Sequence, residues 1–238
     1  LKALFCWSGG KDSALCLHQV LNSDMYEVKY LLTTINATVN RISMHGVREE
    51  LLDQQARSLG ITLIKMYVRE GSFDECEREM GSLLLKMKDE GIEHVIFGDI
   101  FLEDLRAYRE NNLKKVGMHA VFPLWKEDTS ELLNKLLHLK FRTITCCVDH
   151  KILGSEMVGV EIDHEFINKL PMEADPCGEN GEYHTFCFAG PIFKRPIEFT
   201  VGERLFKPWQ SNTNEADDAQ AEQTGFWYCD LIPITTSE

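Results

Sequence analysis

A six-residue run near the start of the chain combines the residue types that bind phosphate. Ser8-Gly9-Gly10-Lys11-Asp12-Ser13 follows the apolar run 3–7 and precedes a segment whose apolar residues recur at helical spacing. Glycines reach backbone angles closed to other residues, so successive amides can turn inward on an anion. The start of a helix adds unpaired N–H groups and a partial positive charge. Together with the lysine and the two serine hydroxyls, these features predict a site for a pyrophosphate group.

This run is not a Walker A loop. That pattern requires glycine where the chain has Phe5, and Ser or Thr directly after the lysine, where the chain has Asp12. A glycine-rich turn without function is the alternative, which the strand-to-helix context disfavours. Asp12 itself is either a helix cap or a residue that coordinates Mg²⁺ through a bound nucleotide.

A second stretch, 175–186 (DPCGENGEYHTF), concentrates acids, amides and glycines between two apolar segments. The acceptors Glu179 and Glu182, with Asn180 as both donor and acceptor, suit a polar substrate or ammonia. The same composition is typical of a tight surface turn. The residues alone do not separate these two interpretations.

Strands and helices are expected to alternate through the first half of the chain. The apolar pattern predicts strands at 3–7, 28–35, 61–68, 95–97 and 120–125, and helices at 14–21, 49–59, 73–90 and 103–116. This alternation indicates a parallel sheet with helices on both faces. Ligands of such sheets bind beyond the carboxyl ends of the strands. Ser8-Gly9-Gly10 and Gly98-Asp99 both follow strands and are therefore predicted to share one site.

The pattern changes after Trp125, and we place a domain boundary near Glu127. A helix at 129–140, capped by Thr129 or Ser130, a strand at 142–148 and a short helix at 163–170 are expected. The acidic stretch 210–224 predicts a loop, and 225–231 predicts a strand that docks back. The predicted fold class is α/β: a doubly wound parallel sheet in domain 1–127 with a smaller C-terminal α+β domain, 128–238.

Composition limits the functional classes. The formal net charge of −13 disfavours nucleic-acid binding, which depends on Lys and Arg neutralising phosphates. The eight cysteines form no C-x-x-C pair, so buried reduced thiols are expected rather than zinc ligands or disulfides. We find no apolar run long enough to cross a membrane and no signal peptide in the first residues. These features predict a cytoplasmic protein.

The two polar signatures together closely resemble those of the diphthine–ammonia ligase family. This family is a branch of the PP-loop ATP pyrophosphatases in the adenine nucleotide alpha hydrolase superfamily. The resemblance spans most of the chain and is carried by 8–13, Gly98 with the helix after it, 123–125 (PLW), 175–186 and 190–193 (GPIF). The first run is the superfamily signature, and 175–186 is more specific to this branch.

The resemblance implies an N-terminal domain that binds ATP with Mg²⁺ and a C-terminal substrate domain that closes over it. It implies ATP-dependent amidation, in which a carboxylate of the acceptor attacks the α-phosphate, pyrophosphate leaves, and ammonia displaces AMP. A modified protein side chain is one form that the acceptor could take, and a homodimer is among the expected assemblies. The residues expected to contact the nucleotide are Ser8, Gly9, Gly10, Lys11, Asp12, Ser13, Ile35, His45 and Gly98.

Catalytic roles are expected for Lys11, Asp12, Asp99, Glu179 and Glu182, with Asp12 also as the metal ligand. The residues expected to face the acceptor or ammonia are Asp104, Arg106, Arg109, Gly178, Glu179, Asn180, Glu182 and His184. Several of these have simpler explanations: a loop histidine for His45, a strand-edge histidine for His184, and a solvated helix face for Arg106 and Arg109.

One segment departs from the family pattern. Family members often carry an Asp-Tyr-Gln-Arg-like run after the glycine that ends the fourth strand, whereas this chain has EDLRAYR at 103–109. The charges remain but their order differs, which leaves ATP use intact and the acceptor open. Two other functions are weighed: a tRNA-modifying ligase or thiolase of the same superfamily, and a non-enzymatic ATP-binding sensor that needs only the first domain.

Overall fold

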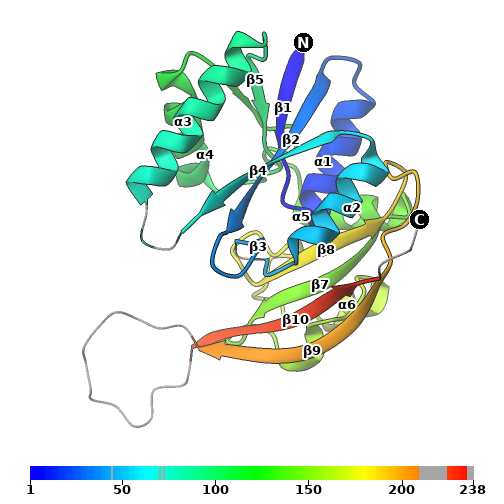
Figure 1. Cartoon of the computed structure of the whole chain (residues 1–238). Coiled ribbons are helices and arrows are strands. Elements are labelled where there is room, and N and C mark those ends of the chain that lie inside the picture. Colours follow the sequence, from blue (N-terminus) through cyan, green and yellow to red (C-terminus); the bar gives the residue numbers. More distant parts are fainter. Residues whose placement is uncertain (44, 70, 72, 209–223, 235–238) are drawn as a thin grey trace.

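Two sheets of different kinds make up the protein, a mostly parallel one above an antiparallel one in the view of Figure 1. The computed structural model describes residues 1–234 except 44, 70, 72 and 209–223. The loop predicted at 210–224 therefore lies outside the described residues, apart from Thr224.

The first sheet is built around β1 (Lys2–Cys6), whose Ala3, Leu4 and Phe5 are fully buried. A strand covered on both faces needs a continuous apolar run, which is the pattern of this segment. The parallel strands lie in the order β4-β2-β1-β5-β6, with short β3 antiparallel to the end of β2. Their bounds are β2 (Glu27–Asn36), β3 (Arg41–Ile42), β4 (Thr62–Val68), β5 (His94–Ile96) and β6 (His119–Val121).

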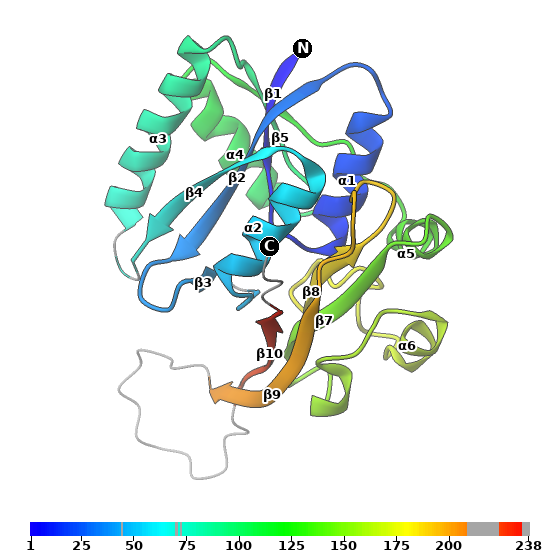
Figure 2. The ribbon, with the colours of Figure 1, turned by 45° about the vertical axis from the view of Figure 1, so that its right-hand side comes forward.

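Helices cover both faces of this sheet, which confirms the doubly wound class. In both views α1 (Lys11–Leu21) and α2 (Glu49–Leu59) lie on one side, and α3 (Phe73–Asp89) and α4 (Glu103–Lys115) on the other (Figures 1 and 2). The strand order reverses between β1 and β5, so the chain leaves these two strands in opposite directions across the sheet. Such a switch point opens a crevice at the carboxyl ends of the two strands.

The second sheet is antiparallel, with strand order β8-β7-β10-β9. Its strands are β7 (Arg142–Asp149), β8 (Tyr183–Ala189), β9 (Phe199–Pro208) and β10 (Gly225–Pro233). The helices α5 (Thr129–His138) and α6 (His164–Lys169) and a 3-10 turn, Ser155–Met157, accompany it. A smaller C-terminal α+β unit is thus confirmed.

Two local predictions need correction. The cap of α5 is Asp128, whose carboxylate accepts a hydrogen bond from the amide of Glu131 at 2.9 Å, and not Thr129 or Ser130. The strand predicted at 120–125 ends at Val121, because Pro123 has no N–H to continue a ladder and the chain turns there.

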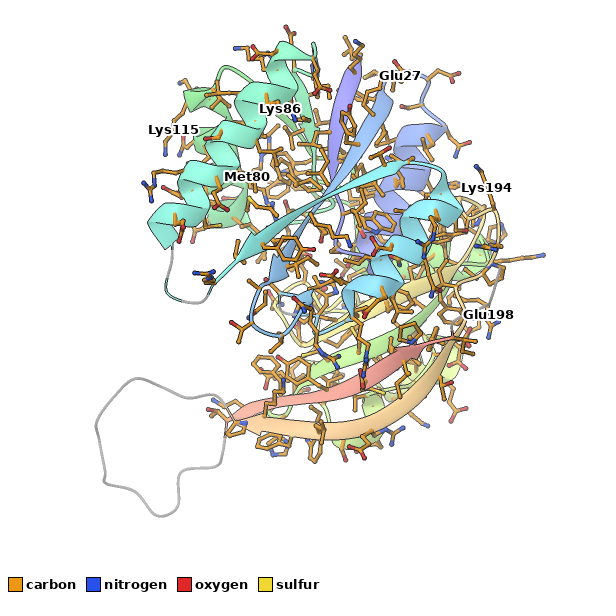
Figure 3. All side chains as sticks on the ribbon, in the orientation of Figure 1. Glu27, Met80, Lys86, Lys115, Lys194 and Glu198 are labelled. Carbon is orange, nitrogen blue, oxygen red and sulfur yellow. The ribbon has the colours of Figure 1, made fainter. Side chains whose placement is uncertain are left out.

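The two sheets share one hydrophobic core. A single cluster of buried side chains includes Phe5 and Leu52 from the first half and Phe141 and Phe186 from the second. Hydrogen bonds reinforce this contact: the backbone N–H of Lys194, labelled in Figure 3 beside the end of α2, donates to the carbonyl of Ser58 at 3.0 Å. The division at residue 127 stays a prediction, and each half presents part of its core to the other.

All eight cysteines are free thiols; six of them are buried, and Cys6 and Cys76 are partly exposed. In the part of the chain that the structure describes, none of the helices has the length and apolarity needed to span a membrane.

Asp230 ties the second sheet to β3 and to the start of α2. Its carboxylate accepts two hydrogen bonds from Arg48, at 2.7 and 3.0 Å, and lies 2.9 Å from the guanidinium of Arg41. These hydrogen bonds, led by that of Arg48, lower the pKa of Asp230 from 3.8 to about 2. A bulge in β10 at this residue turns the carboxylate toward both arginines.

We expect Asp230→Asn to lower the free energy of unfolding by about 1 kcal/mol at neutral pH, because the hydrogen bonds to the arginines lose the charge of the carboxylate. The partial exposure of these groups keeps the loss small. The wild-type advantage should be complete above the ordinary pKa of 3.8 and should be lost as the pH falls through about 2. Urea denaturation of both proteins at several pH values measures it. Glu161→Gln, which breaks the more exposed pair with Arg142, is the control and should cost less. A D230N variant as stable as wild type at neutral pH would contradict the assignment.

Candidate active site

A cavity of about 420 Å³ opens at the switch point between β1 and β5. Its walls come from both halves of the chain: Ser8 and residues 11–13 of the phosphate loop, the end of β2, residues 98–99, and side chains of the C-terminal stretch 178–185. Met80, labelled on α3 in Figure 3, closes the side toward that helix. Two signatures more than 160 residues apart in sequence thus face the same space.

The phosphate loop has the conformation expected of an anion site. Gly9 has a φ of +78°, and Gly10 begins α1 without any side-chain cap. The amide of Gly10 donates to the hydroxyl of Ser8 at 3.3 Å, and the Ser8 and Ser13 hydroxyls lie 3.1 Å apart. The amide of Lys11 donates to the hydroxyl of Thr185 at 3.0 Å, but Gly10 itself caps none of the amides at the start of the helix. Such a helix start, flanked by hydroxyls, is a site that an anion can fill.

Glycine at position 98 keeps this helix start accessible. A side chain there would meet the backbone nitrogen of Ser13 at 3.3 Å. Gly10 is equally confined, since a Cβ would lie 3.1 Å from both the His45 ring and the carbonyl of Thr185. The backbone and its neighbours approach each other closely at both positions because no side chain intervenes.

Lys11 carries a charge that is almost fully buried, with only 2% of the residue exposed. Its ammonium donates to the carboxylate of Asp12 at 2.8 Å and to the carbonyl of Cys177, and lies 4.9 Å from the centre of the Tyr183 ring. Burial opposes the charged form, but Asp12, Tyr183 and Cys177 together outweigh it and raise the pKa of Lys11. The lysine is therefore a fixed cation held by Asp12 and by two groups of the second half of the chain.

Asp99 and Arg109 form the opposite side of the cavity. The guanidinium meets the carboxylate through two contacts of 2.8 and 3.0 Å and stacks over Phe97 at 4.3 Å. Burial raises the pKa of Asp99 above its ordinary value. The charge of Arg109 opposes this shift, and the charge of Asp12 adds to it. Arg109 was predicted to contact the acceptor, and in this structure its charge is engaged by Asp99.

Glu179 bridges the two halves at the cavity wall. One carboxylate oxygen accepts the amide hydrogen of Ile100 at 2.7 Å. Burial raises the pKa of Glu179 to about 7, the Ile100 hydrogen bond lowers it, and the carboxylates of Asp12 and Asp99 raise it. The group can therefore take up or release a proton near neutral pH.

Two histidines from different halves stack beside the loop. The rings of His45 and His184 lie 4.7 Å apart at an angle of 30°, and Nδ1 of His45 lies 3.1 Å from the carbonyl of Thr185. Burial lowers the pKa of His45 to about 4 and that of His184 to about 3. Both rings are neutral at pH 7 and can act as hydrogen-bonding walls without repelling Lys11.

Besides the two loop glycines, five of the predicted residues do not line the cavity. Glu182 is buried and braces the 175–183 loop, with one oxygen accepting from the amide of Asp175 at 2.8 Å and from Asn180 at 3.1 Å. Asn180 and Asp104 are exposed, and Ile35 belongs to the core. Arg106 stacks on Trp125 at 4.5 Å and pairs with Glu110. Their functional roles stay predictions.

Several residues that shape the site were not predicted. Thr185 accepts the amide hydrogen of Lys11 at 3.0 Å, and Cys177 and Tyr183 surround the Lys11 ammonium. All three lie in or beside the polar stretch already singled out, so a partner for the lysine could have been sought there. Thr33 and Thr34 also line the cavity. The sequence feature that could have indicated them is a pair of adjacent polar residues near the end of an apolar strand.

Fold and site define an α/β protein with a doubly wound, mostly parallel sheet and a polar cavity at its switch point. The family model of the diphthamide synthase N-terminal domain matches residues 1–120, and that of the C-terminal domain matches residues 128–216. The chain belongs to the diphthamide synthase family, as its two signatures predicted.

Two diphthine–ammonia ligases are similar in sequence to this chain over most of its length. The diphthine–ammonia ligase of Danio rerio is 26% identical over 222 residues, which cover 83% of this chain and 86% of the relative. That of Mus musculus is 24% identical over 230 residues, covering 83% and 82%. A solved structure described as a predicted subunit of tRNA methyltransferase from Methanocaldococcus jannaschii is 17% identical and covers 83% of this chain and 100% of its own, with a TM-score of 0.43.

The tight fit at Gly10 generates a paired prediction. Gly10→Ala should lower the free energy of unfolding by about 1–3 kcal/mol, because His45 or Thr185 must move away from the new methyl group. Gly81→Ala, inside α3 where a Cβ meets no atom within 4 Å, should raise stability by about 0.5–1 kcal/mol through helix propensity. Chemical denaturation of both variants tests this. Equal effects of the two substitutions would show that position 10 is not confined.

Proposed function

We propose that this protein is an ATP-dependent ligase of the diphthine–ammonia ligase type, which converts a carboxylate into an amide. The observation that carries the proposal is the phosphate loop with its buried Lys11, closed by residues 177–185 of the second half. Membership of the diphthamide synthase family supports the same reaction class.

The loop residues would hold the β- and γ-phosphates as a leaving group. The amide of Gly10, the hydroxyls of Ser8 and Ser13 and the charge of Lys11 supply donors where negative charge develops. An oxygen of the acceptor carboxylate attacks the α-phosphorus, the bond from that phosphorus to the bridging oxygen breaks, and pyrophosphate departs with the electron pair. The product is an acyl-adenylate.

A divalent cation fits the donor set. Asp12 and Asp99 provide hard carboxylate oxygens at the cavity, and Mg²⁺ in nucleotide sites needs only one or two of these besides phosphate and water. Among the described residues no group of three or more side chains forms a metal site without a nucleotide. We infer that Mg²⁺ enters with ATP and that Asp12 holds it, where it would neutralise phosphate charge.

Ammonia would complete the reaction by attacking the acyl carbon of the adenylate. The nitrogen loses a proton as the C–N bond forms, and the bond from the acyl carbon to the AMP oxygen breaks. We propose Glu179 as the proton acceptor, because it lies at the cavity wall and titrates near neutral pH. Walls from both halves would exclude water, which would otherwise hydrolyse the adenylate.

Lys11→Ala should reduce pyrophosphate exchange into ATP by about 100-fold or more, since a fixed cation opposite the leaving group is lost. Exchange is measured with a panel of carboxylates that includes diphthine, and the products of turnover are identified. Lys135→Ala, on the surface of α5, is the control and should exchange like wild type. Formation of ADP and phosphate in place of AMP and pyrophosphate would overturn the mechanism.

The pKa of Glu179 predicts a pH dependence. The carboxylate must be ionised to accept a proton, so kcat/KM, measured at constant free ammonia, should rise through pH 7 and level off above it. Glu179→Gln should be slower and should lose this limb. Because the folded-state pKa is raised, ionised Glu179 destabilises the fold above pH 7, and the Gln variant should be the more stable protein there. A limb that persists in the variant would exclude Glu179 as the base.

A further inference from the structure

Gln55 on α2 makes a network of buried hydrogen bonds behind the phosphate loop. The residue is 0% exposed. Its Oε1 accepts from the indole nitrogen of Trp7 at 2.8 Å, and its Nε2 donates to the carbonyls of Gly9 at 2.9 Å and Cys187 at 2.6 Å. An indole can only donate and a carbonyl can only accept, so the partners fix the orientation of the amide.

These contacts set the direction of the peptide between Gly9 and Gly10. The carbonyl of Gly9 is held from behind by Gln55 and by the amide of Cys187, at 2.8 Å. In a trans peptide the N–H points opposite to the C=O, and the described residues contain no cis bond. The Gly10 N–H therefore points away from Gln55, toward the hydroxyl of Ser8 at the cavity.

Glycine at position 9 makes this restraint necessary. With no Cβ, the backbone reaches both positive and negative φ, so the peptide after it can rotate at little steric cost. A rotated peptide would present the Gly9 carbonyl to the phosphates in place of the Gly10 N–H, and repel them. The loop sequence supplies the mobility, and neighbouring elements must supply the direction.

We infer that Gln55 is a positioning residue for the triphosphate site, which it serves without touching the ligand. It holds the Gly9–Gly10 peptide with its donor toward the phosphates. This inference rests on the proposed function, because it assumes that the β- and γ-phosphates of ATP occupy the loop. Cys187 restrains the same carbonyl, so loss of Gln55 weakens the restraint without abolishing it.

The test measures binding of three probes to Gln55→Met by calorimetry: ATP with Mg²⁺, inorganic pyrophosphate and AMP. We expect the Kd of ATP and of pyrophosphate to rise by a similar factor, about tenfold, the scale of one hydrogen bond to a charged group. AMP has no β- or γ-phosphate, so its Kd should stay at the wild-type value. A purely structural defect would weaken all three probes alike.

Ser58→Ala is the matched control. Ser58 lies on the same helix, is buried, and bonds the backbone of Arg195 in the second half at 2.6 and 3.1 Å without reaching the loop. It should lose stability and keep wild-type Kd values for all three probes. Wild-type pyrophosphate affinity in Gln55→Met, or equal weakening of AMP, overturns the inference. Wild-type protein that binds neither ATP nor pyrophosphate overturns the proposed function and this inference with it.

Discussion

The buried positive charge of Lys11 is the constraint on which the site depends. An ammonium removed from water is costly unless carboxylates, carbonyls or aromatic faces replace its hydration. Here one replacement, Asp12, is local, while the carbonyl of Cys177 and the ring of Tyr183 arrive from the second half. The first half alone would leave this cation half-satisfied. The contact between the two halves therefore also stabilises the charged form of Lys11 in the phosphate loop.

The same contact explains the charge balance of the cavity. Lys11 is paired with Asp12 and Arg109 with Asp99, whereas Glu179 accepts only an amide hydrogen bond among the contacts described. A triphosphate entering this space adds negative charge beside three carboxylates. A divalent cation that enters with it removes the conflict, and without one the added charge would raise the pKa of Glu179 further. The pocket is thus suited to a metal–nucleotide complex more than to a bare nucleotide.

Local patterns predicted the first half well, because its elements are encoded locally. The strand-loop-helix around Ser8–Ser13 and the alternating elements after it follow from apolar periodicity and glycine stops, and both appear as expected. Side-chain direction was harder to predict. Along α4, Leu105 and Arg109 line the cavity one helical turn apart, while Asp104 and Arg106, each adjacent to Leu105, do not. Only the phase of the helix against the sheet separates these residues, and that phase is set by tertiary packing.

The contacts between the two signatures could not be predicted from the sequence. The polar stretch 175–186 was recognised, but nothing in it shows that β8 would run beside the loop and bond Gly9 and Lys11 through Cys187 and Thr185. A contact between a strand and a loop more than 160 residues away is decided by the packing of the whole core and not by any local preference.

The placement of β8 also bears on which function the chain can have. β8 is an edge strand of its own sheet, and edge strands present unpaired backbone groups. Here β8 faces the phosphate loop and bonds its backbone through the backbone amide of Cys187 and the side-chain hydroxyl of Thr185. A nucleotide sensor would need only the first sheet and could leave this edge to water or to another element. An enzyme that must align a carboxylate with an activated phosphate needs the second wall held in register with the first. Direct bonding of the edge strand to the loop provides that register, so the geometry of the cavity favours a ligase that uses the whole chain.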